Sequence, residues 1–293
     1  MWFTWRVDKC VVMGRNQVVE NEINLDFCRR NGIGVFRRKS GGGCVYADLG
    51  NIMMSYVAEG ASVGYTFSKY IGLVVLLLQK LGVPATASGR NDVLVEGRKV
   101  SGSAFLHLPT RNIAHGTLLY DTQMENMVGA LTPTSAKLDA KGVKSVRSRV
   151  GLLKDYVDIG QDELEQHLIN GLCRGEELVL DEDDVRQIER RAQEYLSPGF
   201  LYGSRQTATR MVQKRIEGVG EMRLDLVMRG EVIEDVWVSG DFFCTGRPVD
   251  DLISPLRGVR PEEVELRRAL RDLETEGIVM GLKKDDFIDL IIG

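Results

Sequence analysis

The spacing of hydrophobic and polar positions predicts a first part of the chain that mixes short strands with helices. A helix from about 66 to 81 contains the longest apolar run, at 72–78, and ends where Gly82 and Pro84 interrupt the pattern, so we expect it to be buried. Short apolar runs on either side of Glu96-Gly97 predict a hairpin over 93–104. The other elements predicted here are strands at 2–13, 33–37, 51–57 and 115–120 and a helix at 25–31 closed by Gly32.

A second part of the chain follows two further helices, predicted at 161–173 and 183–195. The latter begins in an acidic run, which suits the positive end of a helix dipole. Ser197-Pro198-Gly199 then breaks the helical pattern, and 202–204 has the composition of a linker. The elements predicted beyond it are a hairpin of strands at 222–228 and 232–238 and helices at 262–275 and 284–291. We therefore expect two domains, 1–203 and 204–293.

The composition agrees with a soluble intracellular enzyme. The 293 residues are 43% hydrophobic, which is enough for one large core and a smaller satellite domain. The net charge of −4, with cations grouped at 29–30 and 37–39, suits a small anionic ligand better than a nucleic-acid backbone. The run at 72–78 is too short to span a bilayer, and no signal-peptide pattern opens the chain. Five cysteines without C-x-x-C spacing indicate neither a disulfide framework nor a zinc site. We expect a cytoplasmic protein with no nucleic-acid or membrane partner.

The segment RRKSGGGCVY at 37–46 carries the first candidate chemistry, because three glycines directly follow three cations. Glycine has no Cβ, so the backbone N–H groups of such a loop can approach an anion closely. Arginine adds fixed positive charge that suits phosphate or carboxylate. Taken alone, the segment is equally compatible with a glycine-rich surface turn whose charges are solvated.

Three further segments favour an anion site. The hairpin at 93–104 would hold Lys99 on a rigid strand, beside the small residues at 101–103 that leave room for a ligand. A His-Gly-Thr sequence at 115–117 precedes a strand-like run, and 144–150 is a basic segment rich in hydroxyl groups. Four such segments in one chain are harder to attribute to chance than one.

These segments resemble the lipoate-protein ligase A family of the biotin/lipoate ligase superfamily. The matching strings are RRKSGGGCVYADLGN at 37–51, SGRNDVLVEGRKVSGSA at 88–104, HGTLLY at 115–120 and KGVKSVRSRV at 141–150. The resemblance implies an α+β fold, with a large mixed-sheet catalytic domain and a small α+β accessory domain at the C-terminus. It also implies a reaction in which ATP, with Mg²⁺, activates lipoate to lipoyl-AMP. The lipoyl group then passes to a lysine of an apo lipoyl domain of a 2-oxo acid dehydrogenase or of the glycine cleavage H protein.

The resemblance also assigns roles to residues. Lys99 matches the catalytic lysine that contacts both the adenylate phosphate and the acyl carbonyl, and Asp92 matches a position near the nucleotide phosphates and the metal. The segment at 144–149 matches a loop that closes over the adenylate and keeps water out. The residues expected to bind ATP or lipoate are Arg38, Ser40, Gly41, Gly42, Gly43, Cys44, Val45, Tyr46, Asn91, Asp92, Ser101, Gly102, His115, Gly116, Thr117, Ser145, Val146 and Arg147.

Each assignment has a structural alternative. Asp92 is also compatible with a residue that caps a turn, and His115 with a buried structural histidine, so we assign His115 no proton transfer. Lys99, Arg147 and Arg149 are compatible with solvated surface cations, although the surrounding motif favours catalysis for Lys99. Arg37 and Lys39 are expected to point away from Arg38, because side chains alternate along an extended chain.

The chain departs from the family pattern at three places. Cys44 stands where members commonly carry alanine, Ala47 stands where they carry histidine, and the chain begins almost directly at its first strand. Two alternative functions follow. Cys44 beside cations suggests an octanoyl or lipoyl transferase that works through a cysteine thioester without ATP. Ala47 and the short start suggest a catalytically silent module that binds lipoate or nucleotide.

Overall fold

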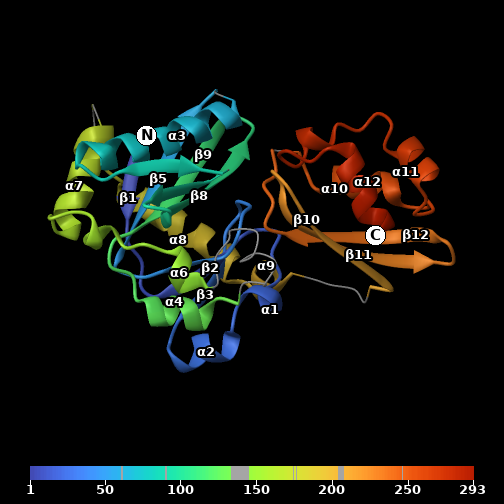
Figure 1. Cartoon of the computed structure of the whole chain (residues 1–293), viewed down its shortest axis with the longest axis horizontal. Coiled ribbons are helices and arrows are strands. Elements are labelled where there is room, and N and C mark those ends of the chain that lie inside the picture. Colours follow the sequence, from blue (N-terminus) through green and yellow to red (C-terminus); the bar gives the residue numbers. More distant parts are fainter. Residues whose placement is uncertain are drawn as a thin grey trace.

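The computed structural model describes residues 1–60, 62–89, 91–132, 145–173, 175, 177–203, 208–245 and 247–293. Figure 1 shows two units: a larger one that contains the first nine strands, and a smaller one built from the last three strands and helices α10 to α12. This agrees with the α+β fold expected from the sequence. Since 204–207 lie outside the described residues, the domain boundary at 203 and 204 stays a prediction.

A six-stranded antiparallel sheet forms the centre of the larger unit, in the order β1-β5-β9-β8-β7-β6. Helix α3 (Val63–Lys80) packs against it, and its buried side chains recur at helical spacing, from Phe67 through Val74 to Leu78. The helix begins a turn earlier than predicted because the side chain of Ser62 accepts a hydrogen bond from the N–H of Tyr65. The strands are β1 (Trp2–Trp5), β5 (Asn51–Glu59), β6 (Ala85–Ser88), β7 (Asp92–Val95), β8 (Arg98–Leu108) and β9 (Arg111–Leu119).

The predicted hairpin at 93–104 is present as β7 and β8. Its turn residues Glu96 and Gly97 both have positive φ, of 49° and 78°, as the tight turns that suit twisted antiparallel strands require. The pairing register shifts between Val93 and Leu94, so a bulge lies close to the start of β7. β8 then pairs with β9 from Ser101 to Leu108, and this pairing starts β9 four residues before the predicted strand at 115.

The single strand predicted at 2–13 is wrong, because this segment forms two strands in two different sheets. β1 is an edge of the large sheet, while β2 (Cys10–Met13) is the centre of a small sheet with β3 (Gly34–Arg37) and β4 (Val45–Ala47). β2 pairs parallel to β3 and antiparallel to β4, so the small sheet of this unit is a mixed sheet. Residues 38–44, hereafter the glycine segment, join β3 to β4. The helices that pack beside this sheet are α1 (Val19–Glu22), α2 (Leu25–Arg30) and α4 (Met124–Ala130).

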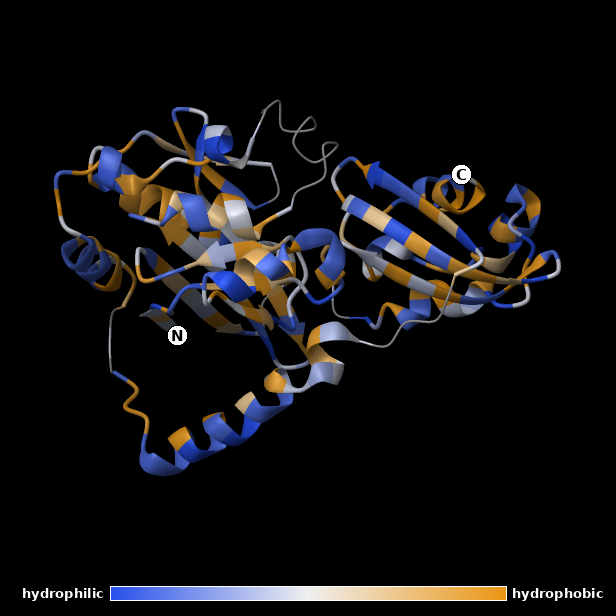
Figure 2. Cartoon of the chain, turned by 90° about the horizontal axis from the view of Figure 1, so that it is seen from below, coloured by the Kyte–Doolittle hydropathy of each residue, from blue (hydrophilic) through white to orange (hydrophobic). Residues whose placement is uncertain are grey.

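The remaining helices of the larger unit lie between α4 and the smaller unit in the sequence. α8 (Glu182–Leu196) has no buried residue and extends outside the body in Figure 2. Ser197 follows it and caps α9 (Pro198–Tyr202) through its side chain. The other elements of this stretch are α6 (Val146–Arg149), the 3-10 turn η1 (Leu153–Asp155) and α7 (Gln161–Leu172).

The smaller unit is a three-stranded antiparallel meander whose apolar face is covered by helices. The hairpin predicted around Arg229-Gly230 is present, and a further strand, β10, lies beside it. The predicted helix at 262–275 ends at Ala269, and a separate 3-10 turn, η3 (Thr275–Gly277), follows. The elements are β10 (Arg210–Ile216), β11 (Gly220–Arg229), β12 (Val232–Gly240), α10 (Asp250–Ile253), η2 (Ser254–Leu256), α11 (Glu263–Ala269) and α12 (Lys284–Ile292).

The two units meet at the glycine segment. The N–H of Gly42 donates to the carbonyl of Phe242 at 3.1 Å, and the N–H of Gly240 donates to the carbonyl of Asn16 at 2.9 Å. The ring of Phe243 enters the core of the larger unit, where it stacks on Phe105 with 5.2 Å between ring centroids. Among the described residues, no helix is both long and apolar enough to cross a membrane.

Candidate active site

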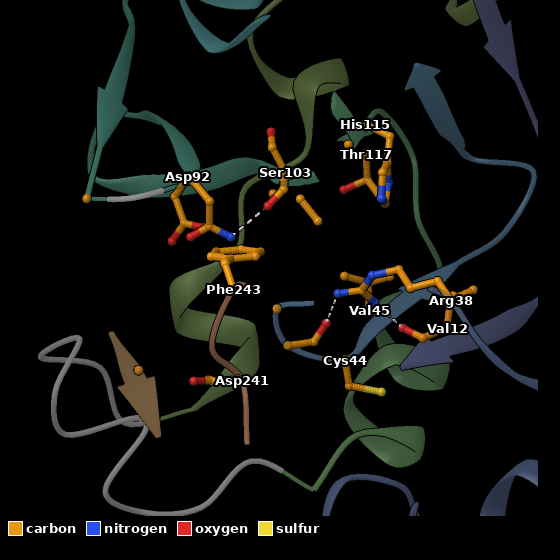
Figure 3. A pocket seen from close by; sticks show the side chains of 18 of the residues that line it. Val12, Arg38, Cys44, Val45, Asp92, Ser103, His115, Thr117, Asp241 and Phe243 are labelled. Atoms are coloured by element: carbon orange, nitrogen blue, oxygen red, sulfur yellow. Dashed lines mark hydrogen bonds between the residues drawn. The ribbon is translucent and has the colours of Figure 1, made fainter. Parts of the chain in front are cut away.

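A cavity of about 810 Å³ lies where the large sheet, the glycine segment and the smaller unit meet. Figure 3 shows Asp92 and Ser103 on one side of it, the glycine segment on the other and Phe243 between them. The predicted residues that line the cavity are Arg38, Gly42, Gly43, Cys44, Val45, Asn91, Asp92, Lys99, Gly102, His115, Gly116 and Thr117. Segments that are distant in the sequence therefore converge on one cavity.

Asp92, Lys99 and Arg149 form an ion cluster, hereafter the Asp92 cluster. It makes the wall of the cavity charged on the side of the large sheet. Lys99 Nζ lies 2.7 Å from Asp92 Oδ1, and Arg149 Nη2 donates to Asp92 Oδ2 at 2.7 Å. The Asp92 side chain is 5% exposed, whereas those of Lys99 and Arg149 are 20% and 21% exposed. One buried carboxylate thus orients two cations that still reach the cavity.

Backbone contacts hold this cluster together. The N–H of Gly151 donates to the carbonyl of Lys99 at 2.9 Å, so the end of α6 is attached to β8 and Arg149 is brought to the strand that carries the lysine. Gly102 makes room for the ammonium, because a Cβ built there would lie 2.6 Å from Lys99 Nζ. The absence of a side chain at Gly102 therefore leaves the space that the Lys99 ammonium occupies.

Arg38 organises the glycine segment from within. Its guanidinium donates to the carbonyls of Val12, Gly41 and Gly43 at 2.9, 2.7 and 2.8 Å, and to Ser40 Oγ at 3.1 Å. Burial lowers the pKa of Arg38 to about 10, so it stays charged at neutral pH. These hydrogen bonds shape the loop, and binding of the ligand anion by Arg38, which also lines the cavity, stays a prediction.

His115 is joined to the same loop. Its Nε2 lies 2.7 Å from Ser40 Oγ. Burial, together with the positive charge of Arg38, lowers the pKa of His115 to about 3. The imidazole is therefore neutral at physiological pH and exchanges a hydrogen bond with a serine hydroxyl, which supports the sequence interpretation that it lines the site without transferring a proton.

The side chains of the three consecutive cations at 37–39 lie in three different environments. Arg37 is buried and donates to backbone carbonyls, among them that of Leu201 at 2.7 Å. Lys39 lies at the surface, 3.1 Å from Glu194. Arg38 alone lines the cavity, as the alternation of side chains along an extended chain predicted.

Some predicted site residues do not line the cavity. Arg147 pairs with Glu125 at 2.6 Å and is 62% exposed, and Ser145 caps α6 by accepting from the N–H of Ser148. Of the predicted closing loop, 144 and the Val146 side chain lie outside the described residues, and it is Arg149 that reaches the cavity. The predicted residues outside the lining are Ser40, Gly41, Tyr46, Ser101, Ser145, Val146 and Arg147.

Sequence reasoning missed the contribution of the smaller unit, to which it assigned no site residue. Arg215, Asp241 and Phe243 all line the cavity. No local signal marked them: Arg215 lies in a strand of mostly polar residues, and Phe243 follows β12 in an ordinary apolar pair.

Cys44, on which the thioester alternative depends, is partly exposed and lines the cavity. In Figure 3 its sulfur points away from both Asp92 and His115. This orientation does not bring a thiol to the charged wall.

The described residues do not form a metal site of their own. They contain no group of three or more His, Cys, Asp or Glu side chains arranged to hold an ion. Both oxygens of Asp92 are in ion pairs with Lys99 and Arg149, so a metal contact there would require one of these pairs to open. Asp92 as a metal ligand stays a prediction.

Comparisons with known proteins identify the family of this chain. Residues 1–173 match the model of the lipoyl protein ligase A/B catalytic domain, and residues 207–291 match that of the bacterial lipoate protein ligase C-terminus. The lipoate-protein ligase LplJ of Bacillus subtilis is 34% identical over 291 residues, covering 96% of this chain and 87% of the relative.

Two solved structures are similar to about 70% of this chain. A lipoate-protein ligase A bound with ATP is 26% identical, with a TM-score of 0.62, and covers 69% of this chain and 85% of that one. A bipartite lipoate protein ligase from Thermoplasma acidophilum, described with its E2 lipoyl domain, is 28% identical, with a TM-score of 0.63, and covers 71% and 86%. The chain therefore belongs to the lipoate-protein ligase family of enzymes.

Proposed function

We propose that this enzyme activates lipoate with ATP to form lipoyl-AMP and pyrophosphate, and then transfers the lipoyl group to a lysine of an apo lipoyl domain. The observation that carries the proposal is the Asp92 cluster, which holds Lys99 and Arg149 at the wall of a cavity closed on its other side by the glycine segment. Family membership, and a relative bound with ATP, support the same reaction.

The first step forms a bond between a lipoate carboxylate oxygen and the α-phosphorus of ATP and breaks the bond to pyrophosphate. Negative charge gathers on the phosphoryl oxygens, so fixed donors aimed at them lower the barrier. Lys99 and Arg149 are such donors, since the carboxylate of Asp92 orients both. The ammonium of Lys99 also suits the acyl carbonyl, because a compact charge on a flexible stem can follow the developing charge.

In the second step the amine of the acceptor lysine attacks the acyl carbonyl, and AMP leaves with the electrons of the anhydride bond. Lys99 stabilises the carbonyl oxygen as its charge rises. The Thermoplasma relative is described with an E2 lipoyl domain, which supports a lipoyl domain as acceptor here. The glycine cleavage H protein is a further expected acceptor, and the cytoplasm the expected compartment.

The requirement for Mg²⁺ is part of the proposal. Mg²⁺ keeps several waters and binds through one or two carboxylates together with substrate phosphates. Since Asp92 already holds two cations, we expect the ion to arrive on the phosphates of ATP.

One assay tests the proposed function. The protein is incubated with lipoate, ATP, MgCl₂ and an apo lipoyl domain, pyrophosphate is measured, and the domain is weighed by mass spectrometry. We expect pyrophosphate release and a domain heavier by one lipoyl group, both only when ATP is present. Modification from an octanoyl-carrier protein without ATP would instead establish the cysteine-dependent transferase, and binding of ATP and lipoate without release would establish the silent module.

A further inference from the structure

The smaller unit contributes its own charged side chains to the cavity. Arg215 at the end of β10, Glu217 in the following turn and Asp241 after β12 all line it. Their position depends on docking of the two units, which the hydrogen bond from Gly42 to Phe242 and the packing of Phe243 maintain. In this arrangement the cavity has walls from both units.

Arg215 is poorly satisfied within its own unit. Its Nη1 is buried and makes no hydrogen bond to any residue in the described part of the chain. The carboxylate Oδ2 of Asp241 lies 3.8 Å from Nη1, beyond hydrogen-bond distance, while Oδ1 accepts from the N–H of Glu221 at 2.7 Å. A buried guanidinium N–H without an acceptor costs free energy, which an anion in the cavity would recover.

Arg223, on the neighbouring strand, is an arginine of the same sheet that makes close contacts with its carboxylate partner. Its Nε and Nη2 lie 2.8 and 2.7 Å from Asp225 Oδ1. The side chains of Arg223 and Arg215 are similarly exposed, at 24% and 25%, and both buried carboxylate partners are 7% exposed. Arg223 does not line the cavity, so the two arginines differ in pairing and in position.

We propose that Arg215 binds a phosphate oxygen of ATP during adenylate formation, so that the smaller unit completes the nucleotide site. The inference rests on the proposed function. Lys99 and Arg149 already share the carboxylate of Asp92, so Arg215 would add positive charge for the triphosphate from the opposite unit. A guanidinium is the side chain best matched to phosphate geometry, and Asp241 limits its freedom to turn away.

The consequence differs between the two half-reactions. Adenylate formation involves the triphosphate and therefore needs Arg215. Transfer from lipoyl-AMP that is already made does not involve pyrophosphate, so it should proceed without Arg215.

The test compares Arg215→Ala and Arg215→Lys with the matched control Arg223→Ala. Initial rates of pyrophosphate release are measured over a range of ATP and lipoate concentrations, and thermal unfolding is recorded for each variant. Transfer from synthetic lipoyl-AMP to an apo lipoyl domain is measured separately. We expect Arg215→Ala to raise the KM for ATP by about 10- to 100-fold, the loss typical of a charged hydrogen bond, with lysine intermediate.

The control, the KM for lipoate and the transfer rate should stay at wild-type values. The inference is wrong if Arg215→Ala behaves as wild type, if Arg223→Ala loses the same activity, or if only the KM for lipoate rises. Failure of the wild-type protein to release pyrophosphate is a separate result, because it would overturn the proposed function.

Discussion

The backbone N–H of Gly42 donates a 3.1 Å hydrogen bond to the carbonyl of Phe242. The residue at the centre of the triglycine sequence is thus held by the smaller unit. A φ of +86° at Gly42 and a ring of Phe243 only 2.8 Å from where its Cβ would lie leave no place for another residue. Gly42 therefore allows the two units to approach closely, and it also lines the cavity.

A methyl group at Gly41 should loosen this contact. In Gly41→Ala the new Cβ would lie 2.5 Å from the carbonyl oxygen of Phe242, which is backbone and cannot turn aside. We expect faster proteolysis between the units and faster hydrogen exchange at Gly42. Gly72→Ala is the control, because nothing lies within 4 Å of its Cβ and alanine favours a helix by about 0.5–1 kcal/mol. Equal protection in the two variants would contradict the expectation.

Loss of the ammonium at position 99 should remove adenylate formation. Lys99→Ala is expected to lower pyrophosphate release by about 10²- to 10³-fold, as loss of one preorganised donor does. The fold should survive, because Arg149 still pairs with the buried Asp92, although stability should fall by roughly 1–3 kcal/mol. Lys39→Ala is the matched control: its surface pair with Glu194 contributes only about 0–1 kcal/mol, and activity should be unchanged. Retained turnover in Lys99→Ala would overturn the central assignment.

Crowding the lysine should act on activity more than on stability. In Gly102→Ala the methyl group would lie 2.6 Å from Lys99 Nζ, and the flexible side chain can move away at little cost to the fold. Because a displacement of about 1 Å can cost about 100-fold in rate, we expect pyrophosphate release to fall by 10-fold or more. Thermal unfolding and steady-state kinetics measured together check this. A loss of stability that fully accounts for the loss of activity would show that the ammonium was not the target.

The free energy of unfolding should decrease as the pH falls, because His115 is buried as a neutral imidazole. Its pKa is about 3 in the folded protein against 6.5 for an unperturbed histidine, so between these values the unfolded chain binds a proton that the folded chain does not. The free energy of unfolding then rises with pH, by at most about 1.4 kcal/mol per pH unit from this group, and levels off above about pH 6.5. Urea denaturation at several pH values should show a shallower dependence in His115→Gln than in the wild type. Identical slopes would mean that the histidine is solvated.

Replacing the thiol in the cavity distinguishes the two acyl-transfer chemistries. Cys44→Ala should keep most ATP-dependent activity, because alanine is close in size and the sulfur points away from Asp92 and His115. The mass of the acceptor domain after incubation with ATP and lipoate measures this. Complete loss of modification, with folding intact, would favour a thioester intermediate.

Local sequence patterns were sufficient to predict an element wherever its structure depends only on neighbouring residues. The turn at Glu96-Gly97 needed only a pair that tolerates positive φ, and α3 needed only apolar residues at helical spacing with a cap before them. The composition of the glycine segment likewise predicted an anion loop, and the structure places Gly42 and Gly43 at the cavity, while anion binding itself stays a prediction. The strand at 2–13 failed because continuity of apolar residues does not reveal which sheet each half will join.

The sequence by itself determined the family and several elements, among them α3 and the two hairpins, and placed Lys99 beside small residues on a strand. Only the tertiary structure decided that Arg149 and not Arg147 reaches the cavity, and that Arg38 holds the loop. It also decided that a second unit supplies part of the wall. The physical reason is the range of the contacts: Asp92 pairs with a residue 57 positions away, and Gly42 bonds to Phe242 in the other unit. Such pairs form only when the whole chain packs, so no window of neighbouring residues encodes them.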